Sequence, residues 1–526
     1  MRTLSLLFCT GVLAACVCLA SGSRTAQPQG VVKVRLKLID AASGKPVPGI
    51  VRAFRKNERK PLELPALFPR LRGLKVAEEF GGWYVVPAEG GETELPRASL
   101  ALEAVSGLET ELARVEIDLE KRPPAEVTIK LNVFARPAEQ GLVAGNTHLH
   151  LMKLSPEEAD KYLKLIPPAD GLRVLFISYL ERHKDDATYV TNRYPIGDLP
   201  QFKATGVLFN NGEEHRHNFK AYGEGYGHVM FLNLRELVKP VSLGPGITGG
   251  GFDDQMLRTG IDAARRQGAT VIWCHNTFGQ EDVPSALAGK LDALNVFDGS
   301  RRGTYEEGYY RYLNVGLRLP ISTGTDWFLY DFSRVYAHVP GKLTIRDWLD
   351  ALKAGRCQVT NSPLLSLKVD GRHPGDVLAI EQPRTVKIEA TAVGRHDFQA
   401  LELIHNGKVI HKVAPKGRDP FRAESVHAVR IDAPGWFAVR IVSSAKNELG
   451  QQLFAHTSPV HIDFQGRRVM DVDAALALLR LVEEAKAAIR SEGTFRNAAA
   501  ANQVQALYDE AARELRQRIN KARERP

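Results

Sequence analysis

Cysteine is scarce in this chain of 526 residues, which contains five. Cys9, Cys16 and Cys18 lie close to the N-terminus, which leaves Cys274 and Cys357 for the body of the protein. Two distant cysteines do not make a disulfide framework, and a chain of this length can rely on its hydrophobic core instead. The sequence therefore predicts a fold held together by its core.

Blocks of like charge and nucleic-acid-binding motifs are also missing. The formal net charge of +9 is modest for this length and is spread through the sequence. The hydrophobic content of 44% and the charged content of 25% are those of an ordinary globular protein, and the length suits three or four domains. This balance indicates a mild preference for anionic ligands and a small-molecule substrate rather than a nucleic acid.

The N-terminus has no apolar run long enough for a stable membrane span. The run from Leu4 to Leu19 follows Met1-Arg2 and is typical of a signal peptide, over about 1–22. Two cleavage sites compete, because Ala20-Ser21-Gly22 suits ordinary signal peptidase, whereas Leu13-Ala14-Ala15-Cys16 resembles a lipobox that would leave Cys16 as a lipid anchor to the membrane. Either site predicts an exported protein, which is periplasmic, secreted or a membrane-anchored lipoprotein in a bacterium.

Alternating apolar and polar residues predict a β-domain on each side of the centre. The alternation over 32–38 and 127–133 indicates an N-terminal β-sandwich at 31–135, which resembles prealbumin-like modules and suits a scaffold or docking role. Alternation returns after residue 364, and Asn406-Gly407 is a strong hairpin signal, so a second β-sandwich is expected at 363–465.

The last segment, 466–526, has apolar residues at helical spacing, interrupted at Gly493. We expect two amphipathic helices that pack as a hairpin on the body or on a second subunit. The sequence therefore leaves open whether the protein forms an oligomer through this tail. Interspersed acidic residues disfavour a membrane-surface role.

The centre, 141–362, combines short apolar strands with helical or loop stretches. Several strands are continuous apolar runs, as expected of parallel strands covered on both faces, and seven of them indicate an α/β barrel slightly smaller than the eight-stranded kind. The strand candidates are Leu142–His150, Leu172–Ser178, Gly206–Glu214, His228–Leu232, Thr270–His275, Ala293–Phe297 and Ile321–Asp326.

Imidazoles and carboxylates recur at the ends of these strands, where barrel active sites are built. His148-Leu149-His150 is a weak metal signal by itself, although a strand would place both imidazoles on one face. The recurrence of ligand-type residues at other strand ends is stronger evidence, since neutral imidazoles with bridging carboxylates suit zinc, manganese or iron. The recurring groups are Glu213-Glu214 at the end of the third strand, His228 at the start of the fourth, His275-Asn276 at the end of the fifth and Asp326 at the end of the seventh.

The order HLH, GEE, GH, CHN and GTD resembles the PHP (polymerase and histidinol phosphatase) superfamily of metal-dependent hydrolases. Within it, the chain is most similar to the exported branch that includes carbaryl and carbofuran hydrolases, because LTIRDWLDALKAGRCQVTNSPLLSLKVDG resembles that branch's stretch after the barrel. The resemblance covers about 141–370 and implies a distorted (β/α)7 PHP barrel. The expected fold class is thus multidomain α/β plus β, a barrel flanked by two β-sandwiches and followed by a helical hairpin.

Carried over residue by residue, the resemblance implies two divalent transition metals, Zn, Mn or Fe, that share one carboxylate. The family's Gly-x-Glu spacing assigns the bridge to Glu214, and Glu213 is the alternative if the register is off by one. The first metal would be held by His148, His150, Glu214 and Asp326, and the second by Glu214, His228 and His275.

Two motifs depart from the family's pattern. The second usually carries Asp-His after a strand, but here the strand runs from Ser178 to a displaced His183. The last is usually Asp-x-His, but here Asp326 precedes Trp327 and Phe328. A binuclear centre is therefore favoured over a trinuclear one.

The expected function is an exported hydrolase that uses a metal-activated hydroxide to cleave a phosphoester, ester or carbamate/amide bond. Strand alternation predicts that Cys274 points away from the metals and takes no part. Arg216, His217, Asn276 and Arg302 are candidate substrate contacts, with solvated loops as the alternative. Two rival functions stay open: an amidohydrolase-type barrel enzyme, which also opens with His-x-His, and a non-catalytic cell-surface binding protein that kept the barrel.

Overall fold

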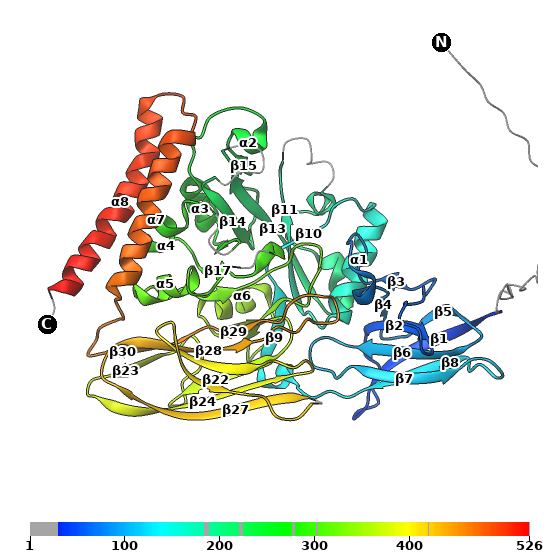
Figure 1. The fold of residues 1–526 in the computed structure, drawn as a ribbon. Helices are drawn as coiled ribbons and strands as arrows, with labels where there is room; N and C mark the ends of the chain where they lie inside the picture. The colour runs from blue at the N-terminus through cyan, green and yellow to red at the C-terminus, as the bar shows by residue number, and fades with distance from the viewer. Residues whose placement is uncertain are drawn as a thin grey trace, which may run out of the picture.

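The computed structural model describes residues 30–182, 189–219, 225–275, 279–299, 303–418 and 420–524, and the backbone alone of residue 300. It shows a mixed α/β protein made mostly of sheets (Figure 1). The expected signal peptide at 1–22, and Cys16 with it, lie outside the described residues, as do His183, Asn276 and Arg302. In the described ranges, no helix has the length and apolar character needed to cross a membrane.

Two sheets form the N-terminal β-domain. The two alternating segments become β1 (Val31–Asp40) and β8 (Glu126–Leu131), which pair in parallel, and β5 (Gly91–Pro96) pairs with β1 on its other side. Their buried side chains, such as Val34 and Leu36, pack against a five-stranded sheet. That sheet has the order β3 (Phe68–Pro69), β4 (Tyr84–Val86), β2 (Gly49–Arg55), β6 (Ser99–Val105) and β7 (Ala113–Asp118).

The central sheet begins as a run of parallel strands. β9 (Leu142–Asn146) pairs with β11 (Val174–Tyr179), which pairs with β13 (Leu208–His217). Further along, β16 (Thr270–Trp273), β17 (Ala293–Asn295) and β18 (Ile321–Ser322) are again parallel. The strand candidates therefore exist, while closure into a (β/α)7 barrel stays a prediction.

One strand differs from the expected parallel order. β14 (Gly227–Leu232) is antiparallel to both β13 and β16, with Arg216 opposite His228. Antiparallel neighbours need no crossover helix, and residues 218–226 alone connect β13 to β14. As a result, His228 at the start of β14 lies at the same edge of the sheet as the end of β13.

Shorter strands complete this region. β20 (Arg334–His338) runs antiparallel to β9, and β10 (Leu149–His150) pairs in parallel with β19 (Asp326–Trp327). Both β12 (Gly197–Asp198) and β15 (Ser242–Leu243) pair with β13.

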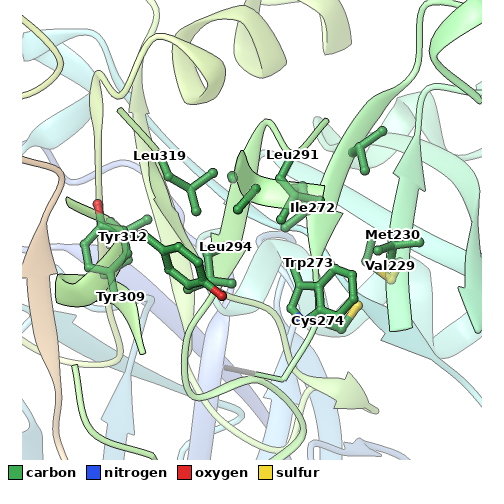
Figure 2. Packing of buried hydrophobic residues seen from close by; sticks show 14 of the residues in the cluster. Val229, Met230, Ile272, Trp273, Cys274, Leu291, Leu294, Tyr309, Tyr312 and Leu319 are labelled. Atoms are coloured by element: carbon green, nitrogen blue, oxygen red, sulfur yellow. The ribbon is translucent and has the colours of Figure 1, made fainter. Parts of the chain in front are cut away.

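Helices cover the central sheet and pack on its buried side chains. Figure 2 shows part of this core, in which Trp273 of β16 and Leu294 of β17 lie between Met230 of β14 on one side and Tyr309 on the other. The helices are α1 (Pro156–Ala169), α2 (Pro245–Thr248), α3 (Leu257–Arg266), α4 (Asp282–Leu287), α5 (Tyr309–Asn314) and α6 (Ile345–Lys353). Single 3-10 turns occur at Glu78–Phe80, Pro137–Gln140, Val190–Arg193, Pro200–Thr205 and Asp298–Ser300.

The central sheet continues into the C-terminal β-domain, because β21 (Cys357–Thr360) pairs with both β20 and β29 (Ala455–Thr457). Asn406 and Gly407 have φ of 50° and 82° and form the expected hairpin turn between β25 (Ala400–His405) and β26 (Lys408–Val413). The other strands are β22 (Leu364–Val369), β23 (Val377–Ile380), β24 (Arg384–Gly394), β27 (Phe421–Ile431), β28 (Gly435–Val442) and β30 (Val460–Phe464).

The tail forms the two expected helices, α7 (Val472–Glu492) and α8 (Ala498–Arg523), with Gly493 at the end of the first and Asn497 capping the second. They lie side by side against the central domain, α7 on α5 and α8 on α4 (Figure 1). The hairpin thus packs on the body, which is one of the two alternatives that the sequence left open.

Two buried arginines tie the domains together. Arg70 of the N-terminal domain donates from Nε to Asp170 Oδ1 (2.8 Å) at the end of α1. Arg395 of the C-terminal domain donates from Nε to Glu448 Oε1 (2.6 Å) and from Nη1 to the Gly107 carbonyl oxygen (2.8 Å). Arg70 thus joins the N-terminal domain to the central domain, and Arg395 joins the C-terminal domain to the N-terminal domain. Removing Arg70 would leave the buried Asp170 carboxylate without its partner.

Candidate metal centre

The HLH segment and Asp326 are brought together by backbone pairing. Beyond β9, the His148 carbonyl oxygen accepts a hydrogen bond from the backbone N–H of Asp326 (2.9 Å). Asp326 itself has φ of 58°, an unusual left-handed conformation that places its carboxylate beside both imidazoles. Its Oδ1 lies 3.4 Å from His148 Nε2 and 3.7 Å from His150 Nε2.

Glu214 lies between two groups of histidines. Its Oε2 is 2.9 Å from His150 Nε2, and its Oε1 is 3.0 Å from His228 Nδ1. His275 Nε2 approaches the same Oε1 to 3.8 Å. One carboxylate therefore faces both groups, each through a different oxygen.

Strand alternation resolves the choice between the two glutamates. Glu213 projects from the other face of β13, where its Oε1 lies 2.9 Å from His215 Nδ1 and its Oε2 accepts a hydrogen bond from the Val238 backbone N–H (2.7 Å). Glu214 is thus the glutamate that reaches the cluster.

The two histidines facing Glu214 Oε1 come from neighbouring antiparallel strands. His228 opens β14, and its Nε2 lies 3.4 Å from Asn218 Oδ1. His275 follows the end of β16 with φ of 62°, which turns the chain out of the strand. Both side chains are buried, at 5% exposure each.

Hydrogen bonds on the far sides of His148 and His150 set their tautomers. His148 Nδ1 lies 2.7 Å from Asp298 Oδ2, and His150 Nδ1 donates to the Ser178 carbonyl oxygen (3.0 Å). Both Nδ1 atoms therefore carry the proton, which leaves the lone pairs on Nε2. These two Nε2 atoms lie 3.0 Å apart and face each other.

This arrangement fits a cation. In the neutral imidazoles, two lone pairs would face each other beside the carboxylates of Glu214 and Asp326 and repel unless a proton or a metal cation lies among them. Buried carboxylates are also costly when unpaired. Asp326 Oδ1 is buried without a hydrogen-bond partner. Histidine nitrogen and carboxylate oxygen are the ligands that zinc, manganese and iron accept.

The pKa shifts reflect the same crowding of charge. Burial lowers the pKa of His148, but Asp298 and Asp326 outweigh it and hold the pKa well above its ordinary value. Burial likewise raises the pKa of Glu214, but Arg216 and the surrounding histidines pull it well below its usual range. The protein thus keeps carboxylate charge at the point where the lone pairs converge.

Buried groups of His, Glu and Asp in this structure could bind metal ions. Among the described residues, three groups have ligand atoms that all lie within 4.8 Å of one another. The first contains His148, His150, Glu214 and Asp326, the second Glu214, His228 and His275, and the third His148, Cys274 and Asp298. The first two are the sets that the family resemblance implied, with Glu214 in both.

The expected position of Cys274 is wrong, since its thiol lies near His148 and Asp298 rather than away from the cluster. Alternation fails here because β16 ends at Trp273 and the backbone of His275 leaves the strand conformation. Burial raises the pKa of the Cys274 thiol, so the thiol stays protonated.

Asp298 is the residue that sequence reasoning missed. It is not among the candidate residues singled out from the sequence, yet it contacts His148 and accepts a hydrogen bond from Asn295 Nδ2 (3.0 Å). The available signal was its position, a carboxylate after the sixth strand candidate, at the same edge as the other groups.

The structure places the candidate substrate contacts in different positions relative to the cluster. Arg216 shares the face of Glu214, with Nη1 3.8 Å from Glu214 Oε2. His217 projects from the opposite face, where it pairs with Asp253 Oδ1 (3.0 Å) and stacks on Tyr226, so the structure does not bring it to the cluster. Asn276 and Arg302 lie outside the described residues.

An aromatic pair flanks the centre. The Trp327 ring lies 5.3 Å from that of His150 and 5.8 Å from that of Tyr189, on which it stacks. In the sequence, Trp327 marked only a departure from the family motif. The pair covers one side of His150 and is partly exposed at Trp327.

Comparison with family models and with curated proteins finds no match. A crystal structure of an engineered protein is similar at a TM-score of 0.16 and 12% identity, over 58% of this chain and 52% of that chain. The match thus spans about half of the engineered protein, and a likeness this weak carries no argument. The resemblance to the PHP superfamily stays a prediction.

Proposed function

We propose that this protein is an exported metal-dependent hydrolase of the PHP type, with two divalent transition metals at the centre around Glu214. The observation that carries the proposal is the position of that carboxylate, whose Oε2 faces His150 at 2.9 Å and whose Oε1 faces His228 at 3.0 Å. Enzymes that hydrolyse phosphoesters, esters or amides commonly place two metals a few ångströms apart in this way.

Divalent ions, when bound, supply Lewis-acid chemistry: they acidify water and polarise the bond to be cleaved. The chain's own residues prepare the site for it. Asp298 and the Ser178 carbonyl hold the protons of His148 and His150 on Nδ1, so both Nε2 atoms are free to ligate. Burial of all these side chains keeps bulk water from competing for them.

β13 also supplies a cation beside this centre, Arg216, which is 8% exposed. A guanidinium here suits a substrate oxygen that gains negative charge during hydrolysis. Cys274 is not the nucleophile in this proposal, because burial keeps its thiol protonated. The bond cleaved is a phosphoester, an ester or a carbamate/amide.

The first experiment measures metal content and hydrolysis together, in a matched pair of variants. Glu214→Gln removes the bridging charge, whereas Glu213→Gln changes the neighbouring residue on the other face of β13. The protein, purified without chelators, is analysed by inductively coupled plasma mass spectrometry. It is then assayed with bis(p-nitrophenyl) phosphate, p-nitrophenyl acetate and an aryl N-methylcarbamate.

We expect about two transition metals per chain in the wild type and in Glu213→Gln, and loss of at least one in Glu214→Gln. Hydrolysis of one substrate class should fall by about a hundredfold or more in Glu214→Gln alone. Full metal loading without turnover of any substrate would instead favour a non-catalytic binding protein. A folded protein that binds no added Mn²⁺ or Zn²⁺ would contradict the metal centre itself.

A further inference from the structure

A cavity of about 480 Å³ lies at the junction of the central sheet and the C-terminal β-domain. Leu142, at the start of β9, lines it, whereas the chain reaches His148 only beyond the other end of that strand. The cavity is therefore separate from the metal centre. Its volume falls within the range of small-molecule sites.

Basic side chains converge on this cavity from four separate segments. His338 ends β20, Arg356 precedes β21, Lys368 lies in β22, and His373 lies in the turn before β23. Asp376 is the carboxylate among the lining residues. Arg356, Lys368 and His373 are exposed, so a ligand can reach these basic groups from solvent.

The positive and negative charges of the side chains that line the cavity do not balance. Asp376 Oδ2 already accepts a hydrogen bond from the His373 backbone N–H (2.9 Å). Within the described part of the chain, Arg356 and Lys368 form no ion pair. Asp376 therefore offsets the charge of only one of these two cations, and an anion bound beside Arg356 and Lys368 would offset the other.

The wall of the cavity is preformed and partly apolar. Gln358 Nε2 donates to the Leu365 carbonyl oxygen (2.9 Å), and Gln358 Oε1 accepts from the Leu365 backbone N–H (2.7 Å), which locks β21 against β22. Leu142 and Pro374, which are both half-buried, add apolar surface to the same cavity. A ligand would meet a fixed wall, so little conformational entropy is lost on binding.

We propose that this cavity binds a small organic anion, whose acidic group is held by Arg356 and Lys368 and whose apolar body lies along Leu142 and Pro374. The site bridges the central and C-terminal domains, so its ligand also stabilises their junction. The proposal does not depend on the metal centre or on hydrolysis.

The probe is p-toluenesulfonate, which is not hydrolysed, binds divalent metals weakly and matches the cavity in charge and size. Binding to the full chain is measured by isothermal titration calorimetry, with methyl p-tolyl sulfone as the uncharged analogue of the same shape. The variants are Arg356→Gln, Lys368→Gln and their double variant. Lys408→Gln, an exposed lysine of β26 in the same domain, is the matched control.

We expect saturable binding of the sulfonate and about tenfold weaker binding of the sulfone, because the charge-assisted hydrogen bonds are lost. Each single variant should weaken sulfonate binding by about tenfold and the double variant by more, with Lys408→Gln unchanged. Three results would each overturn the proposal. These are sulfonate binding that the double variant leaves intact, equal binding of the sulfone, and no sulfonate binding at a concentration of ~10 mM, which lies well above the ~1 mM dissociation constants of weak specific sites.

Discussion

Asp298 Oδ2 lies 2.7 Å from His148 Nδ1, and this contact aims the His148 Nε2 atom at the candidate metal centre. A carboxylate behind a ligating histidine fixes the tautomer and the ring orientation and makes the other nitrogen a better ligand. The same arrangement recurs at His150, where the Ser178 carbonyl oxygen takes the role of the carboxylate.

Asp298→Asn should weaken metal binding by about 10- to 100-fold, because the amide still accepts a hydrogen bond but no longer carries charge. The measurement is competition for Zn²⁺ with a calibrated chelator. Asp253→Asn is the matched control, since Asp253 pairs with His217 on the opposite face of β13 and should leave metal affinity unchanged. Equal affinities in both variants would remove Asp298 from the centre.

Cys274→Ala should leave hydrolysis within about threefold of the wild type, because a protonated buried thiol is a poor nucleophile. Loss of a true nucleophile lowers turnover by several orders of magnitude. Cys357→Ala, the other buried free cysteine in the body, is the control for packing. The initial rates are compared at equal metal content, and collapse of activity in Cys274→Ala alone would contradict the assignment.

The ion pair between Arg70 and Asp170 should matter far more than a similar pair on the surface. Arg70 is fully buried, so Arg70→Ala leaves the Asp170 carboxylate without its partner and should cost about 3–5 kcal/mol of stability. Arg72→Ala breaks an exposed pair with Glu158 and should cost about 1 kcal/mol or less. Thermal unfolding of the two variants measures the difference, and comparable losses would show that Arg70 does not anchor the N-terminal domain.

Glu281 should make stability depend on pH. Burial raises its pKa from 4.5 to about 7, although the Leu257 and Arg258 backbone N–H groups donate to it. Between these pH values the folded protein keeps a proton that the unfolded chain has lost, so this group's contribution to stability falls as pH rises from 4.5 to 7. The loss is at most about 3 kcal/mol.

Glu281→Gln cannot ionise and should therefore gain Tm relative to the wild type as pH rises through this window. Melting curves at pH 5 and pH 7.5 test this, with Glu307→Gln as an exposed control. Parallel pH profiles for Glu281→Gln and the wild type would refute the contribution of Glu281.

The strand positions and most residues of the cluster could be predicted from sequence, because apolar runs mark buried strands and ligand-type residues stand at their ends. The antiparallel course of β14 could not, since a run such as Gly227–Leu232 reads the same in either direction. His228 stands at the start of its strand candidate, whereas the other groups stand at the ends of theirs, and that was the one local sign of the reversal.

Departures from regular backbone explain the remaining differences. The left-handed conformations of His275 and Asp326 reorient side chains that alternation would have placed otherwise, and this is how Cys274 comes near His148. The contacts of Asp298 with His148 and of Arg70 with Asp170 join residues far apart in the chain. No local sequence pattern predicts such pairs.

Anomalous X-ray diffraction from crystals grown with Mn²⁺ or Zn²⁺ tests the central claim most directly. The account predicts two anomalous peaks about 3.5–4 Å apart, with the Glu214 carboxylate between them. One peak should lie among His148, His150 and Asp326, and the other beside His228 and His275. Crystals with no peak within reach of Glu214 would contradict the account.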